Sequence, residues 1–261
     1  MPEAAPASAL PPPPAPLYVD EHLLAFDKPA GLLAVPGRGP DKADCLSARV
    51  QALWPEALIV HRLDQATSGL MLMARHRLAQ RLLGDAFASR AVRKSYQALV
   101  CGHPAAVHAA CLPAAAAPQA EEDEKSEEEI DEKNGAAPPP PWAAIALPLR
   151  PDWPNRPRSV VDASGGKPSL TLWRPLPGAP RLPPAWPQPP AVGRVALRPI
   201  TGRSHQLRLH MQAVSLPIWG DALYAPHAWP APRLMLHAHR LHLRHPISGQ
   251  PLHLRTPALP F

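Results

Sequence analysis

Proline determines where this chain can form regular structure. It accounts for 40 of the 261 residues, and it lacks the backbone N–H that helix interiors and central strands require. Much of it lies in three stretches, 11–16, 138–141 and 175–190. Apolar residues make up 46% of the chain, an ordinary share for a globular protein. The sequence therefore predicts a folded body that carries proline-rich tails and loops, rather than a wholly disordered chain.

The middle of the chain interrupts this body. Residues 104–147 are rich first in alanine, then in acidic residues and then in proline, without an amphipathic pattern of useful length. We expect a low-complexity, solvated insertion at about 104–147 and a disordered tail at 1–16. Because both ends of the remaining chain contribute strands and loops, residues 17–261 are predicted to form a single domain.

Apolar periodicity places the elements of that domain. Apolar side chains at helical spacing predict helices within 76–90 and 203–214. Apolar runs bounded by turn residues predict strands at 17–28, at the end of 61–75, and at 94–102, 193–199 and 234–244. The expected fold class is α/β in the broad sense, with strands and helices mixed in one domain.

The folded body is more basic than the whole chain. Residues 121–133 hold nine acidic residues and two lysines. Without them, 25 lysines and arginines face 12 acidic residues, which raises the formal net charge from +6 to +13. Such a body attracts polyanions, of which nucleic acid is the commonest. An arginine-rich genome would produce the same composition, so charge alone does not decide the partner.

The three cysteines, Cys45, Cys101 and Cys111, are odd in number and show no CxxC spacing. They indicate a reducing compartment and no disulfide framework. No apolar run reaches the 18 residues of a membrane-spanning helix, and proline interrupts the region where a signal peptide would need an apolar stretch. We therefore expect a cytoplasmic protein.

Two segments could carry chemistry. The sequence HRLD at 61–64, followed by TSG at 67–69, places a carboxylate beside an arginine ahead of an apolar strand. The alternative is ordinary turn chemistry, with Asp64 as a turn residue. The sequence TGRSHQLRLH at 201–210 joins a glycine to a helix start, which suits a phosphate. An amphipathic helix with a solvated basic side would give the same pattern.

Two further segments are weaker candidates. Tyr96 lies in a basic strand and could stack on an exposed base, or it could be a half-buried strand residue. The histidine-rich run at 237–245 could bind zinc, but His242 and His245 lie on opposite faces of a strand. No HExxH or cysteine-rich complement accompanies it. We expect no metal site there.

Together and in this order, these segments resemble the signature of the RluA-type pseudouridine synthases. The resemblance covers nearly all of 17–103 and 148–261. Its motifs are HRLDxxTSG at 61–69, KxYxA at 94–98, TGRSHQLRxH at 201–210, DKPAGLL at 27–33, GDxLY at 220–224 and LHA at 236–238.

The resemblance implies the pseudouridine synthase fold, a mixed and mainly antiparallel sheet with flanking helices and a central active-site cleft. It implies an enzyme that isomerises uridine in structured RNA. Because that isomerisation involves no redox change, we expect no cofactor and no metal. Before residue 17 there is no room for the S4 RNA-binding domain that many relatives carry.

The resemblance also implies roles for residues. Asp64 is the catalytic carboxylate, as nucleophile or as base, and Arg208 is its cationic partner. Tyr96 is the third catalytic residue, expected to stack on the flipped uracil and to help remove the C5 proton. Arg62 is expected to enter the RNA where that base has left. The remaining motif residues are expected to contact the RNA around the flipped base: His61, Thr67, Arg203, His205 and Gln206.

Within the family, VPGR at 35–38, DWPNRP at 152–157 and GKP at 166–168 are similar to members that modify both a large-subunit rRNA hairpin and a tRNA anticodon arm. We expect the same two RNA partners, no membrane, and a monomer. The alternatives are an rRNA-only or tRNA-only synthase, a non-catalytic RNA-binding relative, and a zinc-dependent hydrolase. The insertion and the proline-rich loop at 175–191 depart from the family pattern.

Overall fold

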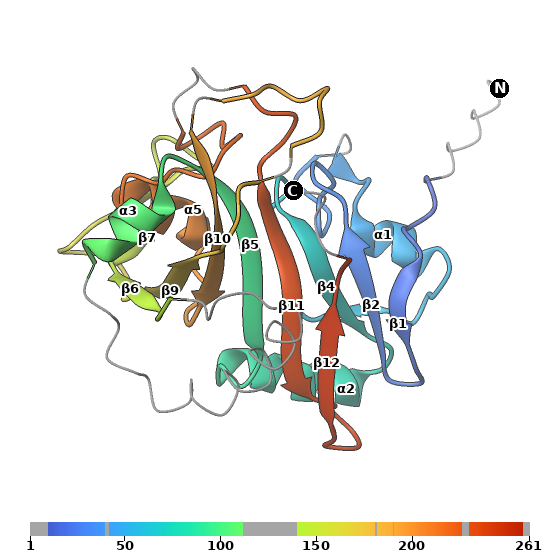
Figure 1. Cartoon of the computed structure of the whole chain (residues 1–261). Coiled ribbons are helices and arrows are strands. Elements are labelled where there is room, and N and C mark those ends of the chain that lie inside the picture. Colours follow the sequence, from blue (N-terminus) through green and yellow to red (C-terminus); the bar gives the residue numbers. More distant parts are fainter. Residues whose placement is uncertain are drawn as a thin grey trace. The chain divides into compact units, whose positions relative to one another are not determined.

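The computed structural model describes residues 10–39, 42–111, 140–180, 182–189, 191–225 and 230–257 (Figure 1). Residues 1–9 of the predicted tail and 112–139 of the predicted insertion therefore lie outside the described residues. The predicted tail ends one residue too late, because Pro16 already belongs to strand β1 (Pro16–Val19). The predicted limits of the insertion are too wide, because helix α3 (Pro104–Ala109) and strand β6 (Ala143–Ala146) lie inside them. Proline at the start of α3 favours a helix N-terminus, and β6 is too short for its alternation to be evident.

The chain forms two compact units, each built from segments far apart in the sequence. Unit 1 comprises Met1–Val92 and His242–Thr256, and unit 2 comprises Arg93–Leu241 and Pro257–Phe261. The chain returns from unit 2 to unit 1 within strand β11 (Leu236–Arg244). The single domain expected from the sequence is thus subdivided. None of the described helices is long and apolar enough to cross a membrane.

Unit 1 is built on antiparallel strands. Its elements are β1 (Pro16–Val19), β2 (Leu23–Lys28), α1 (Leu46–Gln51), β3 (Leu58–Ile59), β4 (Ser68–Ala74), α2 (Arg77–Ala88) and β12 (Pro251–Arg255). Strand β2 pairs with β1 on one side and with β4 on the other, and the register places Lys28 opposite Gly69. Phe26, Met71 and Met73 belong to a buried core cluster. This register brings the end of β2 beside the start of β4.

The predicted strand at 17–28 is two strands, because Asp20 forms a turn between them. Its Oδ1 accepts hydrogen bonds from the backbone N–H groups of His22 and Leu23, at 2.7 and 2.8 Å. This arrangement is the usual way in which aspartate stabilises a turn. The polar residues Asp20, Glu21 and His22 interrupt the apolar run at this turn, so the sequence did contain a signal for the break.

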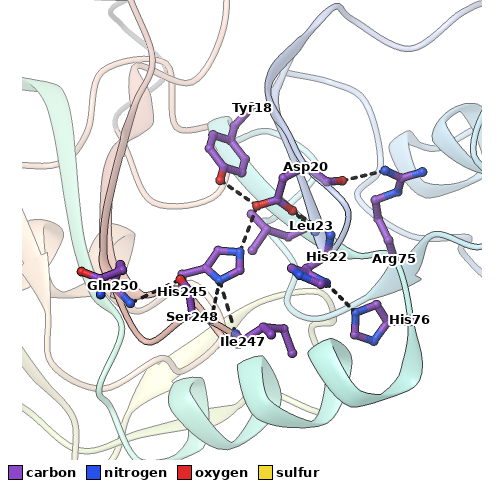
Figure 2. A network of polar contacts seen from close by, with 10 residues as sticks. All are labelled: Tyr18, Asp20, His22, Leu23, Arg75, His76, His245, Ile247, Ser248 and Gln250. Carbon is purple, nitrogen blue, oxygen red and sulfur yellow. Dashed lines mark hydrogen bonds and ion pairs between the residues drawn. The ribbon is translucent and has the colours of Figure 1, made fainter.

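Figure 2 shows the same carboxylate at the centre of a wider polar network. Its Oδ2 accepts from the Tyr18 hydroxyl at 2.7 Å and pairs with His245 Nε2 at 2.9 Å. His245 Nδ1 accepts from the N–H groups of Ile247 and Ser248, which leaves Nε2 as the donor to Asp20. The network therefore ties the β1–β2 turn to the turn between β11 and β12.

We expect Asp20→Asn to destabilise unit 1 at neutral pH. Burial disfavours the Asp20 carboxylate, but hydrogen bonds from Tyr18, His22, Leu23 and His245 outweigh it and lower its pKa to about 2. A pKa below the unfolded value means that this contribution is present above about pH 4 and is lost as pH falls toward 2. Urea unfolding at pH 7 should show a loss of about 1–3 kcal/mol. The difference should shrink at pH 3, and equal stability at pH 7 would contradict the prediction.

Unit 2 is also built on antiparallel strands. Its elements are β5 (Arg93–Cys101), α3, β6, β7 (Leu149–Pro151), β8 (Ser159–Val161), β9 (Leu170–Pro175), β10 (Val192–Pro199) and α5 (Gln206–Ala213). Strands β5, β10, β9 and β6 pair in that order, and β7 and β8 form a separate hairpin. Elements β5, β10 and α5 confirm the strands and helix predicted there. The mixed, mainly antiparallel fold class is confirmed as well.

Candidate active site

The loop that carries Asp64 is held at several points within unit 1. Leu63 and Thr67 are buried, whereas the Asp64 side chain is partly exposed between them. Thr67 N donates to the Asp64 carbonyl at 3.1 Å, which closes a tight turn. His61 Nε2 accepts from Leu72 N at 2.9 Å, and its ring stacks on Phe87 of α2 at 4.5 Å. The loop therefore presents one carboxylate from a fixed backbone.

Lys28 anchors the loop that carries Asp64, and the sequence did not indicate this role. The lysine is fully buried, and its Nζ donates to the carbonyl oxygens of Pro29, Leu32 and Gln65, at 2.9, 2.7 and 3.1 Å. Gly31 N also donates to the Gln65 carbonyl, at 2.9 Å. Gly31 has φ +87, a conformation that favours glycine. The residue after Asp64 is thus fastened to the turn that follows β2.

The buried ammonium also acts on the electrostatics of the loop. Burial lowers the pKa of Lys28 to about 8, while the nearby carboxylates of Asp64 and Asp27 act in the opposite direction. At neutral pH the lysine therefore stays a cation close to Asp64. The available sequence signal was a lysine at the end of a largely apolar strand, directly before a proline.

We expect Lys28→Met to lower both stability and turnover. Methionine fills a similar volume but removes the shared donor from the carbonyl oxygens of Pro29, Leu32 and Gln65, the last of which still accepts from Gly31 N. The loss should cost about 2–4 kcal/mol. Turnover should fall by about 10²-fold, because small displacements of a catalytic group have effects of that size. Urea unfolding and turnover below the unfolding temperature would measure both. The exposed Lys42→Met is the control, and full activity of Lys28→Met would contradict the anchoring role.

In unit 2, Gln206 organises the segment at 201–208. It is buried, and its Oε1 accepts from the Thr201 hydroxyl and Arg203 N at 2.7 and 3.0 Å. Its Nε2 donates to the Leu170 carbonyl and the Thr171 hydroxyl, at 2.9 and 3.0 Å. Gln206 therefore shapes the loop before α5, and its predicted contact with RNA stays a prediction.

The predicted phosphate site at this helix start is partly occupied by the protein itself. Arg203 N donates to Gln206 Oε1, and Gln206 N donates to the Arg203 carbonyl. The side chain of Arg203 is exposed, and Lys94 Nζ lies 4.0 Å from the position that a Cβ on Gly202 would take. The positive charge at this turn therefore comes from the side chains of Arg203 and Lys94.

Arg208 is buried and forms a bidentate ion pair with Asp221. Its Nε and Nη2 donate to the two carboxylate oxygens at 2.7 and 2.6 Å. Asp221 Oδ1 also accepts from the N–H groups of Leu223 and Tyr224. The sequence placed Asp221 in a closing motif without giving it this role. Because Asp64 belongs to unit 1 and Arg208 to unit 2, their predicted pairing stays a prediction.

Tyr224 packs beside this ion pair. The Arg208 Cζ lies 5.1 Å from the centre of its ring, and its hydroxyl pairs with His205 Nδ1 at 2.8 Å. His205 has φ +56, so it bends the chain into α5 from the left-handed region. Tyr96, half-buried on β5, lies opposite Leu197 of β10 in the same unit. Unit 2 therefore brings His205 and Arg208 together around Tyr224.

The histidine-rich strand is β11. His237 and His239 are both buried, and their rings lie 6.3 Å apart. Burial, with His239 and Arg233 nearby, lowers the pKa of His237 to about 3, so its imidazole is neutral. Within the described ranges, no group of three or more His, Cys, Asp or Glu side chains is placed to hold a metal ion.

Comparison with known proteins gives consistent similarities. The family model of RNA pseudouridylate synthases matches residues 22–213. The dual-specificity RNA pseudouridine synthase RluA of Escherichia coli (strain K12) is 38% identical, over 93% of this chain and 92% of its own length. The enzyme of the same name from Yersinia pestis is 39% identical, over 93% and 98%.

Two solved human structures share the fold. RNA Pseudouridylate Synthase Domain Containing 1 has a TM-score of 0.64 at 24% identity, covering 94% of this chain and 83% of its own. Domain Containing 4 has a TM-score of 0.61 at 20% identity, covering 94% and 88%.

Proposed function

Because this chain belongs to the RNA pseudouridylate synthase family, we propose that it converts specific uridines to pseudouridine in both 23S rRNA and the tRNA anticodon stem-loop. The observation that carries the proposal is 38–39% identity to dual-specificity enzymes over 93% of this chain. The family makes the chain an isomerase that acts on RNA. The two RNA substrates are the part that remains to be tested.

The reaction breaks the N1–C1′ glycosidic bond, turns the uracil, and rejoins it to C1′ through C5. In our proposal Asp64 provides the carboxylate at the sugar, as nucleophile or as base. The support is a loop fastened by Lys28, His61 and Thr67, which leaves the Asp64 side chain partly exposed. A fixed backbone lowers the cost of bringing the carboxylate to the reacting atom.

Arg208 is proposed to hold Asp64 ionised, and Tyr96 to stack on the flipped uracil. The support for Arg208 is its fixed orientation, since its Nε and Nη2 both donate to Asp221 and this pairing sets the plane of the guanidinium. Both assignments require units 1 and 2 to act as one catalytic domain, which we propose together with a monomeric state.

Exposed arginines are proposed to bind the RNA. Arg62 follows the anchored His61, and Arg203 precedes α5; both side chains are exposed. Extrusion of the uridine costs a few kcal/mol, and a side chain that fills the vacated space offsets this cost. Arg62 is proposed for that position. His205 and Thr67 are buried, which favours a supporting role for them in the RNA-binding loops.

Tritium release from C5-labelled uridine tests the proposal directly. Two transcripts are needed, a large-subunit rRNA hairpin and a tRNA anticodon arm, with Asp64→Ala as the inactive control. Release from both transcripts, absent in the control, is the expected result. Release from one alone would establish the rRNA-only or tRNA-only alternative. Release from neither, with intact RNA binding, would favour the non-catalytic relative.

A further inference from the structure

The hairpin β7–β8 carries a tryptophan in an unusual setting. Trp153 is 64% exposed. Trp142, by contrast, is 6% exposed and belongs to the core, where it packs against two arginines. A tryptophan exposed to this extent presents an aromatic face on which another planar group can stack. The Cζ of Arg156 lies 3.4 Å from the centre of the Trp153 ring, so a guanidinium already stacks on the indole.

The loop that presents this pair is internally ordered. Asp152 N donates to the Arg158 carbonyl at 2.9 Å, and Arg158 N donates to the Asn155 carbonyl at 3.0 Å. The Asp152 carboxylate accepts from Asn155 Nδ2 at 3.0 Å. The loop thus uses its acidic side chain internally, while Arg156 and Arg158 are exposed. Its outer surface is therefore aromatic and cationic.

The base of the loop is joined to the catalytic motif of unit 2. Ser159 N donates to the Tyr224 hydroxyl at 2.8 Å, and the same hydroxyl pairs with His205. The Cζ of Arg158 lies 5.5 Å from the Tyr224 ring, which also lies against Arg208. One tyrosine therefore connects the base of the loop to His205 and Arg208.

We propose that Trp153 and Arg156 form a stacking platform for an unpaired base of the substrate RNA other than the target uridine. Bases in RNA loops stack on aromatic rings and on guanidinium planes, and an exposed Trp–Arg pair offers both. The positive charge of the loop suits the phosphates that flank an unpaired base. The inference rests on the proposed function, since it assigns a second contact to the same RNA.

The test compares Trp153→Ala and Trp153→Phe in the full-length chain. Kd for the two transcripts is measured by fluorescence anisotropy, and KM and kcat by tritium release. Trp153→Ala should raise Kd and KM about 10-fold, the effect of losing one stacked base. Its kcat at saturating RNA should equal that of the wild type, and Trp153→Phe should recover most of the affinity. Because stacking neutralises no phosphate, the salt dependence of Kd should not change.

Two arginine variants separate the platform from general charge. Arg156→Ala removes one positive charge and the stacked guanidinium, so it should weaken binding more than Arg81→Ala, which removes one exposed charge on α2 in unit 1. If Trp153→Ala has the same Kd and KM as the wild type on both transcripts, the inference is wrong. The exposed loop would then be assigned to a protein partner. A fall in kcat with unchanged Kd would also overturn the inference.

The two proposals fail separately. Wild-type protein that binds the transcripts without releasing tritium would contradict the proposed function, and the Kd comparison would still decide the platform. Tritium release by wild type, together with unchanged binding by Trp153→Ala, would contradict the platform alone.

Discussion

Asp64→Asn is expected to reduce tritium release to below about 10⁻³ of the wild-type rate, because a positioned acid–base or nucleophilic group contributes effects of about 10²–10⁴-fold or more. Asparagine has nearly the same shape as aspartate but carries no charge and is not a base. The turn should persist, since it depends on the Asp64 carbonyl, which accepts from Thr67 N, and not on the side chain.

Folding and RNA binding of this variant should be retained. The Asp64 side chain is partly exposed, and the loop is held by the neighbouring residues Leu63 and Gln65. Thermal unfolding and anisotropy with the anticodon-arm transcript would measure stability and Kd. Asp85→Asn, which removes an exposed carboxylate on α2, is the matched control and should keep full activity. Wild-type turnover by Asp64→Asn would refute the assignment of the catalytic carboxylate.

Local patterns in the sequence were enough to predict the longest strands and the two longest helices, but not the shorter elements. The apolar run at 68–74 follows a polar loop, and it forms β4 with every residue buried. Helix α2 follows from apolar spacing, because one face of a helix must be buried against the sheet. The strand at 17–28 was predicted without its division, although Asp20 begins a short polar segment there and forms a turn with backbone N–H groups.

The supporting contacts of the candidate site could not be predicted, because each depends on residues distant in the sequence. Lys28 is fastened to Gln65, 37 residues later, and its burial depends on the pairing of β2 with β4. Asp221, which follows α5 in the sequence, accepts a hydrogen bond from Arg208 on that helix. Motif patterns identified the segments but not these partners. The two units likewise arise from contacts between the ends of the chain, which periodicity does not reveal.

Arg208→Lys is expected to lose about 10²-fold or more in kcat although the charge is kept. Two parallel hydrogen bonds to Asp221, at 2.7 and 2.6 Å, fix the plane of the guanidinium. A lysine ammonium is a point charge and cannot reproduce this fork, so the remaining N–H groups would lose their direction. If those groups orient Asp64, the loss should appear in kcat, with a much smaller change in the Kd for RNA.

Arg203→Lys is the matched control, because Arg203 lies in the same segment but is exposed. A phosphate contact requires charge more than a bidentate fork, so Arg203→Lys should retain most activity. Asp221→Asn provides the second comparison: it keeps Arg208 but weakens the fork, and it should lower kcat in the same direction by a smaller factor. Near wild-type turnover by Arg208→Lys would show that charge alone suffices, and the role proposed for the Asp221 pair would then be wrong.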